Sequence, residues 1–551
     1  MRRNLTIFTA RKVITMDPGL PVADAVAVAD GRIVEVGSMA SMRPWLDVHD
    51  HVIDDRFSGS VIMPGLIDPH LHPVMAAVLL AYGIVAPESW DLPGDHIPAC
   101  PNREAVFERI ATLARGPANG EPLLLWGTHE AWHGVITRAD LDAACPDRPV
   151  VLRDRSFHVL ILNSAAISWL GLQRPAPPPA EEQINWETGV FSENGMWYAL
   201  EALMPYLSAP DRIDRGIELV KNLVHRGGVT TCADLAAGAF LGPDGEWDVL
   251  RRNLDADDTP FRTYLVPVPK NWENLYRETP EEILSRITSL PANDTPRLQW
   301  LKAIKTFGDG AFVTQHMKLC EPGFIDGHEG EWMTRPEELE KIIRPYWDAG
   351  FDVYHHVTGD LGVEVCLDAL SSLQTRQPRA EFRFDLQHFG VSREHQADRM
   401  RRLGATASGN GYYLYLLADK YAEYGLGAER ADQMVRLGSL ARNAVRFSLH
   451  SDLPMGPVRP LLAASTAATR LTSGGTVRGP GQAVPIEHAL RAVTIDAAWM
   501  LHRDHEIGSI AAGKKADFTV LGSDPFAVTP AEVSDIPIRA TVFEGQPHFI
   551  K

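Results

Sequence analysis

Val61-Ile-Met-Pro-Gly-Leu-Ile-Asp-Pro-His-Leu-His-Pro73 is a short apolar strand that ends in two histidines one residue apart. Because side chains alternate along a strand, His70 and His72 leave its carboxyl end on the same side, where they can hold one metal ion. A bare His-x-His can also be a pair of surface histidines. The flanking Gly65, Asp68 and Pro73 favour the metal site.

Composition narrows the class of protein. The 551 residues exceed an average single domain, and 45% hydrophobic and 23% charged residues are typical of a globular protein. A net charge of −18 argues against nucleic acid as a partner. No apolar run approaches the ~20 residues that span a bilayer, so no membrane association is expected. Five cysteines without a Cys-x-x-Cys pair, and polar residues behind Arg2-Arg3 where a signal peptide would be apolar, predict a cytoplasmic protein.

The sequence patterns at both ends of the chain predict β-strands. Asp24–Val36 contains two alternating strands around Asp30-Gly31, which is a strong hairpin turn. Near the carboxyl end, Ala516–Leu521 and Ile538–Phe543 are further short strands. We therefore expect residues 1–60 and 505–551 to form one small β-sandwich domain.

The middle of the chain alternates strands with helical patterns such as Pro336–Ala349 and Val391–Leu403. Eight β/α units predict an α/β fold, a (β/α)8 TIM barrel, from residues 61–73 and 226–504. The long gap after the first strand predicts a large insertion, residues 74–225, over the barrel mouth. The expected strands are Val61–Ile67, Val229–Asp234, Phe261–Val266, Leu301–Phe307, Phe351–His356, Phe382–His388, Ala405–Ser408 and Val445–Ser451.

Residues able to bind metals recur at the carboxyl ends of these strands, which is where TIM barrels place their active sites. Besides His70 and His72, the strand ends carry Lys305, His355-His356, His388 and His450-Ser451-Asp452. Each residue alone is weak evidence for a metal site. A lysine in a strand is usually a surface residue, and an aspartate after a strand often caps a helix. Their coincidence at five of eight strands favours one shared site.

The order His-x-His, Lys, His, His, Asp resembles that of the metal-dependent amidohydrolase superfamily. Within it the chain is similar to the amidohydrolase-3 branch, which includes N-substituted formamide deformylases. The stretches that carry the resemblance are Met63–His72, Leu141–Val150, His158 with Asn163–Ala165, Gly228–Thr231, Lys305 with Asp309-Gly310, His356 with Gly359-Asp360, Ser451-Asp452 and Gly508–Asp517.

The resemblance implies two divalent metal ions, with zinc expected. His70 and His72 would hold the more buried ion and His356 and His388 the more exposed one. Lys305 would bridge them as a carbamate derived from CO2, and Asp452 would bind the buried ion. A metal-bridging hydroxide would attack a carbonyl, with Asp452 as general acid and base. A homodimer would also agree with the family.

The insertion contains His129-Glu-Ala-Trp-His133, which matches the His-Glu-x-x-His pattern of zinc proteases. That pattern needs a helix, and the glycines on both sides argue against one. We expect instead that Trp132 and His133 contact a small-molecule substrate, as would His158 and Tyr412. The tyrosines near Tyr412 indicate an apolar or aromatic substrate group. Ordinary packing is the alternative for each of these residues.

The expected activity is cleavage of an amide-type carbon–nitrogen bond, non-peptide or cyclic, in a small molecule. Deamination of a heterocycle on the same fold is the second hypothesis, but such deaminases usually lack the bridging lysine. Ester, lactone or carbamate hydrolysis would use the same residues. A binding protein without activity would be expected to lose ligand residues, and all six are present.

Overall fold

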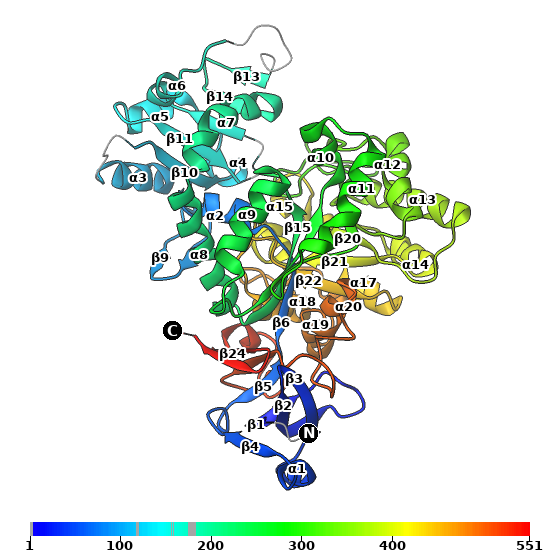
Figure 1. Cartoon of the computed structure of the whole chain (residues 1–551). Coiled ribbons are helices and arrows are strands. Elements are labelled where there is room, and N and C mark those ends of the chain that lie inside the picture. Colours follow the sequence, from blue (N-terminus) through cyan, green and yellow to red (C-terminus); the bar gives the residue numbers. More distant parts are fainter. Residues whose placement is uncertain (1–3, 117–120, 156, 158, 175–182, 551) are drawn as a thin grey trace. The chain divides into compact units, whose positions relative to one another are not determined.

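The structure is a computed structural model that describes residues 4–116, 121–155, 157, 159–174 and 183–550 (Figure 1). The chain divides into two compact units. One contains Met1–His72 and Lys221–Lys551, and the other contains Pro73–Val220. All six predicted metal ligands belong to the first unit.

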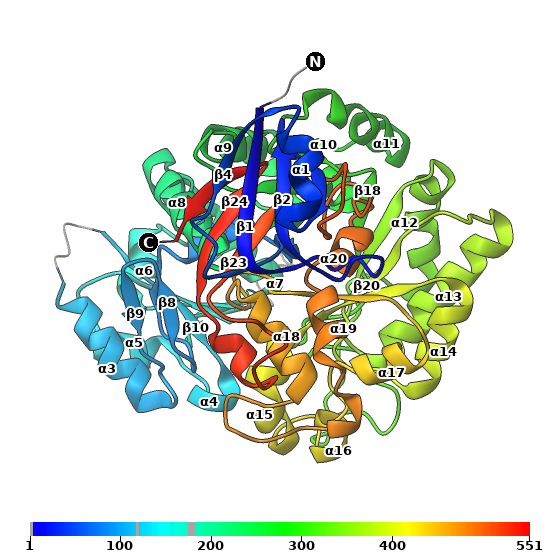
Figure 2. The ribbon, with the colours of Figure 1, turned by 90° about the horizontal axis from the view of Figure 1, so that it is seen from below.

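Strands from both ends of the chain share one eight-stranded sheet. Its order is β25-β24-β23-β5-β1-β2-β3, with β4 beside β1, and Figure 2 shows the amino-terminal and carboxyl-terminal strands next to each other. The predicted hairpin is confirmed, because β2 and β3 pair antiparallel and Asp30 and Gly31 both have positive φ. The strands are β1 Asn4–Ile14, β2 Val22–Ala29, β3 Arg32–Gly37, β4 Asp50–Asp54, β5 Val61–Pro64, β23 Phe518–Leu521, β24 Ile538–Phe543 and β25 Gln546–Phe549.

The rest of the first unit is built on two parallel sheets. One has the order β17-β16-β15-β6 and the other the order β18-β19-β20-β21-β22. Strand β22 contacts β6, and β16 contacts β18. The strands are β6 Leu66–Leu71, β15 Val229–Ala237, β16 Arg262–Pro267, β17 Leu298–Trp300, β18 Ala303–Phe307, β19 Asp352–Val357, β20 Phe384–His388, β21 Thr406–Asn410 and β22 Phe447–His450. The fold is α/β, as predicted.

Helices connect most of the successive parallel strands. Helix α12 begins at Pro336, as the pattern predicts, and buries Leu339, Ile343 and Trp347 at helical spacing. Helix α14 begins later than predicted, because Gln396 Oε1 accepts the Arg393 N–H and starts the helix there. The helices of this unit include α1 Met39–Leu46, α9 Gly242–Leu254, α10 Pro269–Tyr276, α11 Pro280–Ser289, α12 Pro336–Asp348, α13 Asp360–Arg376, α14 Glu394–Leu403, α15 Ala418–Glu423, α17 Leu437–Arg442, α18 Pro460–Thr469, α19 Ile486–Arg491 and α20 Ile495–Met500.

The expectation of one strand over Val61–Ile67 is wrong. The chain forms β5, which pairs with β1 and β23 in the terminal sheet, and then β6, which pairs with β15. The crossing occurs at Gly65, where a Cβ atom would lie 1.9 Å from Thr230 Oγ1. A continuous apolar run gives no sign of such a crossing, because both strands are buried on all sides.

The second unit has its own mixed sheet and apolar core. The sheet order is β13-β14-β12-β11-β10-β7, in which β7, β10 and β11 are parallel. Its core includes Leu125, Val150 and Leu152. The elements are α2 Pro73–Leu79, β7 Gly83–Ile84, β8 Trp90–Leu92, β9 Asp95–Ile97, α3 Arg103–Ala114, β10 Leu123–Thr128, α4 Glu130–His133, α5 Arg138–Ala144, β11 Val150–Asp154, β12 Val159–Leu162, α6 Ser164–Trp169, β13 Ile184–Asn185, β14 Val190–Ser192 and α7 Glu193–Leu207; α8 Pro210–Arg226 runs into the first unit.

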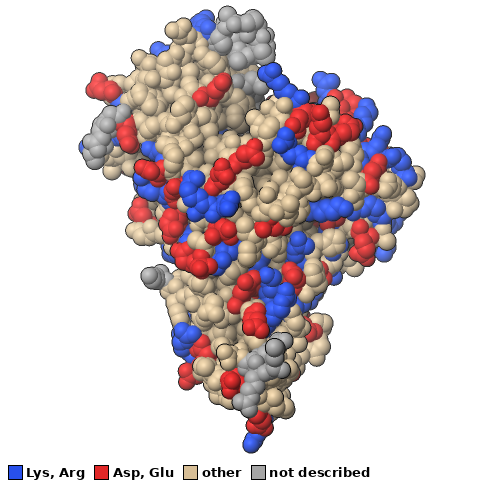
Figure 3. Space-filling view, viewed as in Figure 1, with Lys and Arg blue, Asp and Glu red and all other residues tan. Residues whose placement is uncertain are grey.

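Helix length and surface charge both concern the possible partners, membrane and nucleic acid. Within the described ranges, every helix is too short or too polar to cross a bilayer. On the face drawn in Figure 3, Lys and Arg side chains lie interspersed with Asp and Glu.

Candidate metal centre

His70 is buried in β6 in a defined tautomer. Its Nδ1 lies 2.6 Å from Oε1 of Gln387, at the end of β20. Gln387 in turn donates to the carboxylate of Asp385, so its amide oxygen must face His70. Because that oxygen can only accept, Nδ1 of His70 carries the proton. Nε2 therefore carries a lone pair, and it makes no hydrogen bond to any described residue.

The Asp452 carboxylate lies among three imidazoles. Its Oδ1 is 3.5 Å from Nε2 of His70 and 3.2 Å from Nε2 of His72, and its Oδ2 is 3.5 Å from Nδ1 of His388. The Asp452 N–H donates to the carbonyl of His70, which ties the end of β22 to the end of β6. The left-handed φ values of His388 (73°) and Asp452 (58°) show that the backbone is held in an uncommon conformation at this site.

His72 is held by a second carboxylate. Its Nδ1 lies 3.3 Å from Oδ1 of Asp234, a residue of β15 that the sequence analysis does not assign to the site. Burial alone would lower the pKa of His72, but the hydrogen bonds to Asp234 and Asp452 raise the pKa to about 9. A carboxylate behind a histidine is the usual arrangement that orients an imidazole toward a metal ion.

His450 stands among the strand-end residues of the sequence, but it is not one of the six predicted metal ligands. It is buried at the end of β22, and its Nε2 lies 3.3 Å from Nδ1 of His388. The ligand atoms of His70, His388 and His450 lie within 4.8 Å of one another, as do those of His70, His72 and Asp452. The sequence feature that could have indicated a role for His450 is its position at the end of a strand, two residues before Asp452.

Lys305 is buried in β18 and within electrostatic reach of this cluster. Burial lowers the pKa of its amine to about 7, against the opposing effect of Asp452, Asp385 and Asp234. A positive charge on Lys305 lowers the pKa values of His70 and His388 in turn, although burial is the larger cause for both.

The histidine pair on β19 divides its side chains between two directions, as alternation in a strand requires. The His356 ring lies 4.5 Å from the ring of His388, measured between centroids. His355 instead places Nδ1 2.8 Å from Oγ1 of Thr306. The structure thus brings His356 beside His388, although His356 belongs to neither of the two close groups of ligand atoms.

These residues fit a divalent cation. Burial holds the pKa values of His70, His388 and His450 well below the ordinary value, so that their imidazoles are neutral. Neutral imidazoles and a carboxylate converging in a buried space are the donor set that zinc and related ions bind.

A sequence model of the amidohydrolase family matches residues 57–549, which is most of the chain. The chain belongs to the amidohydrolase family. As a member of this family, it is an amidohydrolase enzyme.

Relatives match over nearly the whole length of the amidohydrolase. The N-substituted formamide deformylase of Arthrobacter pascens is 26% identical over 555 residues, covering 98% of each chain. Protein LONG AFTER FAR-RED 3 of Arabidopsis thaliana is 26% identical over 563 residues, covering 98% of this chain and 91% of that protein. The crystal structure of an uncharacterized metal-dependent hydrolase from Pyrococcus horikoshii OT3 matches with a TM-score of 0.73 at 20% identity, covering 96% of this chain and 99% of that one. This last likeness supports a fold of the TIM-barrel type.

In the His-Glu-x-x-His stretch of the amidohydrolase, the histidine side chains make hydrogen bonds within the insertion. Helix α4 is four residues long, and Nδ1 of His129 accepts the Ala131 N–H at its start. Nδ1 of His133 accepts the His129 N–H, and its Nε2 lies 2.7 Å from the Cys100 carbonyl oxygen. Both ring nitrogens of His133 are thus engaged within the insertion, as is the ring of Trp132, which packs against His129. His158 lies outside the described residues.

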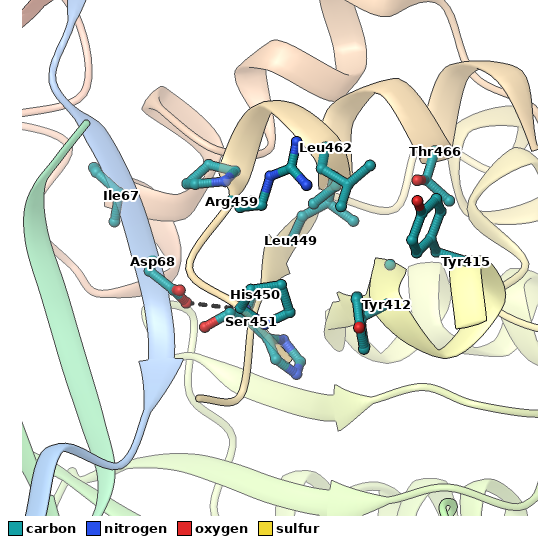
Figure 4. A pocket seen from close by; sticks show the side chains of 14 residues that line it. Ile67, Asp68, Tyr412, Tyr415, Leu449, His450, Ser451, Arg459, Leu462 and Thr466 are labelled. Carbon is teal, nitrogen blue, oxygen red and sulfur yellow. Dashed lines mark hydrogen bonds between the residues drawn. The ribbon is translucent and has the colours of Figure 1, made fainter. Parts of the chain in front are cut away.

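Tyr412 lines a pocket of about 370 Å³, including its open mouth, in the first unit of the amidohydrolase. Figure 4 shows Tyr412 and Tyr415 on one side and Asp68 on the other, with His450 and Ser451 between them. The pocket shares His450 with the metal cluster. Tyr413, by contrast, is buried and stacks on Phe312 with ring centroids 4.4 Å apart, so it belongs to the packing.

Proposed function

We propose that this amidohydrolase cleaves an amide-type, non-peptide carbon–nitrogen bond in a small molecule at a centre of two divalent ions, with zinc as the metal. The observation that carries the proposal is the position of Asp452, whose two carboxylate oxygens face His70, His72 and His388 at 3.2–3.5 Å.

In this proposal His70, His72 and Asp452 hold one ion, and His356 and His388 hold the other. Lys305 joins them as a carbamate. Its neutral amine would add to CO2 and lose one proton, which would give an anionic ligand with two oxygens. A buried amine within electrostatic reach of His70, His388 and His450 supports this assignment, because an ammonium there would oppose bound cations. Bound ions would acidify a water molecule and polarise the substrate carbonyl.

Asp452 is the proposed proton carrier. Its carboxylate accepts the proton of the attacking water and delivers it to the leaving nitrogen. Its backbone N–H bond to His70 holds the carboxylate at the ends of β6 and β22. Asp234 and Gln387 orient His72 and His70 from behind, so that the imidazoles keep their positions during turnover.

The proposed substrates are N-substituted formamides and related small or cyclic amides that carry an apolar or aromatic group. The likeness to a formamide deformylase over the whole chain supports this class. The pocket beside His450, with Tyr412, Tyr415 and Leu462, supports the apolar group. Trp132, His133 and His158, all in the insertion, remain proposed substrate contacts.

The proposal includes the architecture that the site requires. The contacts of β22 with β6 and of β16 with β18 support closure of the parallel strands into one (β/α)8 barrel. The eight strands near the chain ends would form the small β-sandwich. All five cysteines are free, which supports a cytoplasmic location. A homodimer is the proposed assembly.

The test uses the full chain loaded with zinc and a panel of N-substituted formamides, anilides, cyclic amides, aryl esters and aminoheterocycles. We expect release of amine and carboxylate from amides, loss of activity after chelation and recovery on adding zinc. Release of ammonia from the heterocycles without amide cleavage would show a deaminase. Faster turnover of esters than of amides would place the activity among the esterases.

A further inference from the structure

His450 has the geometry of a metal ligand. Its Nδ1 lies 2.7 Å from Oγ of Ser408, and that hydroxyl also accepts a hydrogen bond of 2.8 Å from Ser448. The ring packs against His70 with centroids 4.7 Å apart. Ser408 thus fixes one ring nitrogen, while Nε2 is directed at His388.

The separation of Nε2 of His450 from Nδ1 of His388 is 3.3 Å. Two nitrogens bound to one zinc ion at ~2.0–2.1 Å with a tetrahedral angle lie about 3.3 Å apart. The pairs that join Asp452 to His70, His72 and His388 fall at 3.2–3.5 Å, which is the same range. The four imidazoles and Asp452 therefore share the spacing of atoms around bound cations.

We propose that His450 is a further imidazole ligand of the metal centre, which binds through Nε2 the ion that His388 also binds. This inference rests on the proposed function, because it requires a divalent ion at the site. In the ligating tautomer Nδ1–H of His450 donates to Oγ of Ser408, and Nε2 carries the lone pair.

His355 provides a matched comparison within the chain. It is also a buried histidine on a parallel strand, and its Nδ1 also faces a hydroxyl on the neighbouring strand, Thr306 Oγ1 at 2.8 Å. Unlike His450, it belongs to neither close group of ligand atoms. Comparing substitutions at the two positions therefore separates the effect of losing a metal ligand from the effect of losing a buried imidazole.

The first test is a crystal structure of the zinc-loaded full chain with anomalous diffraction at the zinc edge. We expect Nε2 of His450 at ~2.0–2.1 Å from an ion. An ion bound by His388 with Nε2 of His450 more than about 3 Å away would overturn the inference and leave the proposed function intact. A wild-type chain that binds no divalent ion would overturn both.

The second test compares His450→Asn with His355→Asn by zinc content and by affinity in competition with a chelator. We expect His450→Asn to lose one ion or to bind it at least 100-fold more weakly, and His355→Asn to keep both. Equal affinities of His450→Asn and wild type would refute the ligand role.

If His450→Asn does not fold, Ser408→Ala is the variant that tests the ligand role. It leaves the imidazole in place and removes the hydroxyl that orients it, so we expect a 10–100-fold weaker affinity for one ion. Unchanged affinity in this variant would also count against His450 as a ligand.

Discussion

Gln387 decides which nitrogen of His70 faces the metal centre. Its amide oxygen takes the Nδ1 proton, and its amide nitrogen is held by Asp385, which Thr406 also contacts. This chain of contacts joins β6, β20 and β21 behind the predicted ligand. A substitution at Gln387 would therefore change metal binding without touching a ligand atom.

Replacement of Gln387 by Ala is expected to weaken zinc binding by about 10–100-fold, because His70 loses the acceptor that fixes its tautomer. Affinity is measured by chelator competition. Gln396→Ala is the control, since Gln396 of α14 is a buried glutamine whose amide donates to the Asp360 carbonyl and the Glu364 carboxylate, both in α13. Equal affinities in the two variants would show that the contact does not tune the centre.

Replacement of Asp452 by Asn is expected to lower kcat by about 10²- to 10⁴-fold at saturating zinc, because an amide cannot carry the proton. Circular dichroism and zinc content verify that the fold and most of the metal remain. Near-normal turnover in this variant would remove Asp452 from the proposed role.

The candidate ligands could be predicted from sequence more readily than their partners. Alternation places His70 and His72 together, and strand ends collect Lys305, His388 and Asp452. Gln387, by contrast, is 317 residues away from His70 along the chain, and Asp234 is 162 residues away from His72. Only the folded arrangement of strands shows which side chains meet behind the ligands.

At the scale of elements, Gly65 lets the chain pass from the terminal sheet into the first parallel strand. Its N–H donates to the carbonyl of Asp517, and the next N–H, of Leu66, donates to Oγ1 of Thr519. The two histidines follow within seven residues. The position of this crossing therefore sets the register of β6 and with it the direction of His70 and His72.

Gly65→Ala is expected to destabilise the first unit by roughly 1–3 kcal/mol, because the new methyl group overlaps Thr230. The measurement is the shift of the unfolding transition in urea. Gly59→Ala is the matched control, since nothing lies within 4 Å of its Cβ position. Equal midpoints for the two variants would refute the close packing at the crossing.

The periodic elements could be predicted because their patterns are local. The Asp30-Gly31 hairpin and helix α12 depend on residues within one segment. The split of the first strand could not be predicted, because the partners that divide it, β23 and β15, lie far away in sequence. An apolar run indicates that a strand is buried, but it does not indicate which sheet the strand joins.

At the scale of the whole chain, a buried ion pair ties the carboxyl-terminal strands to the parallel sheets. Arg262 of β16 lies 2.5 Å from Asp517, just before β23, and 3.1 Å from Glu544, just after β24. The Arg262 side chain is fully buried. Asp517 closes the Gly508–Asp517 motif, so this part of the family resemblance has a structural role.

Asp517→Ala is expected to destabilise the protein by about 3 kcal/mol, since a buried guanidinium loses one of its two carboxylates. The unfolding midpoint tests this, with Asp398→Ala as the control in an exposed pair with Arg402, where less than about 1 kcal/mol is expected. A loss no larger than that of the control would contradict the role of the pair.

In the proposed function, side chains spread over nearly four hundred positions surround two ions that Lys305 bridges. Metal content per chain, measured for wild type and Lys305→Ala after loading with zinc and removal of excess, tests it most directly. We expect about two ions in the wild type and one or none in the variant. One tightly bound ion in both proteins would contradict it.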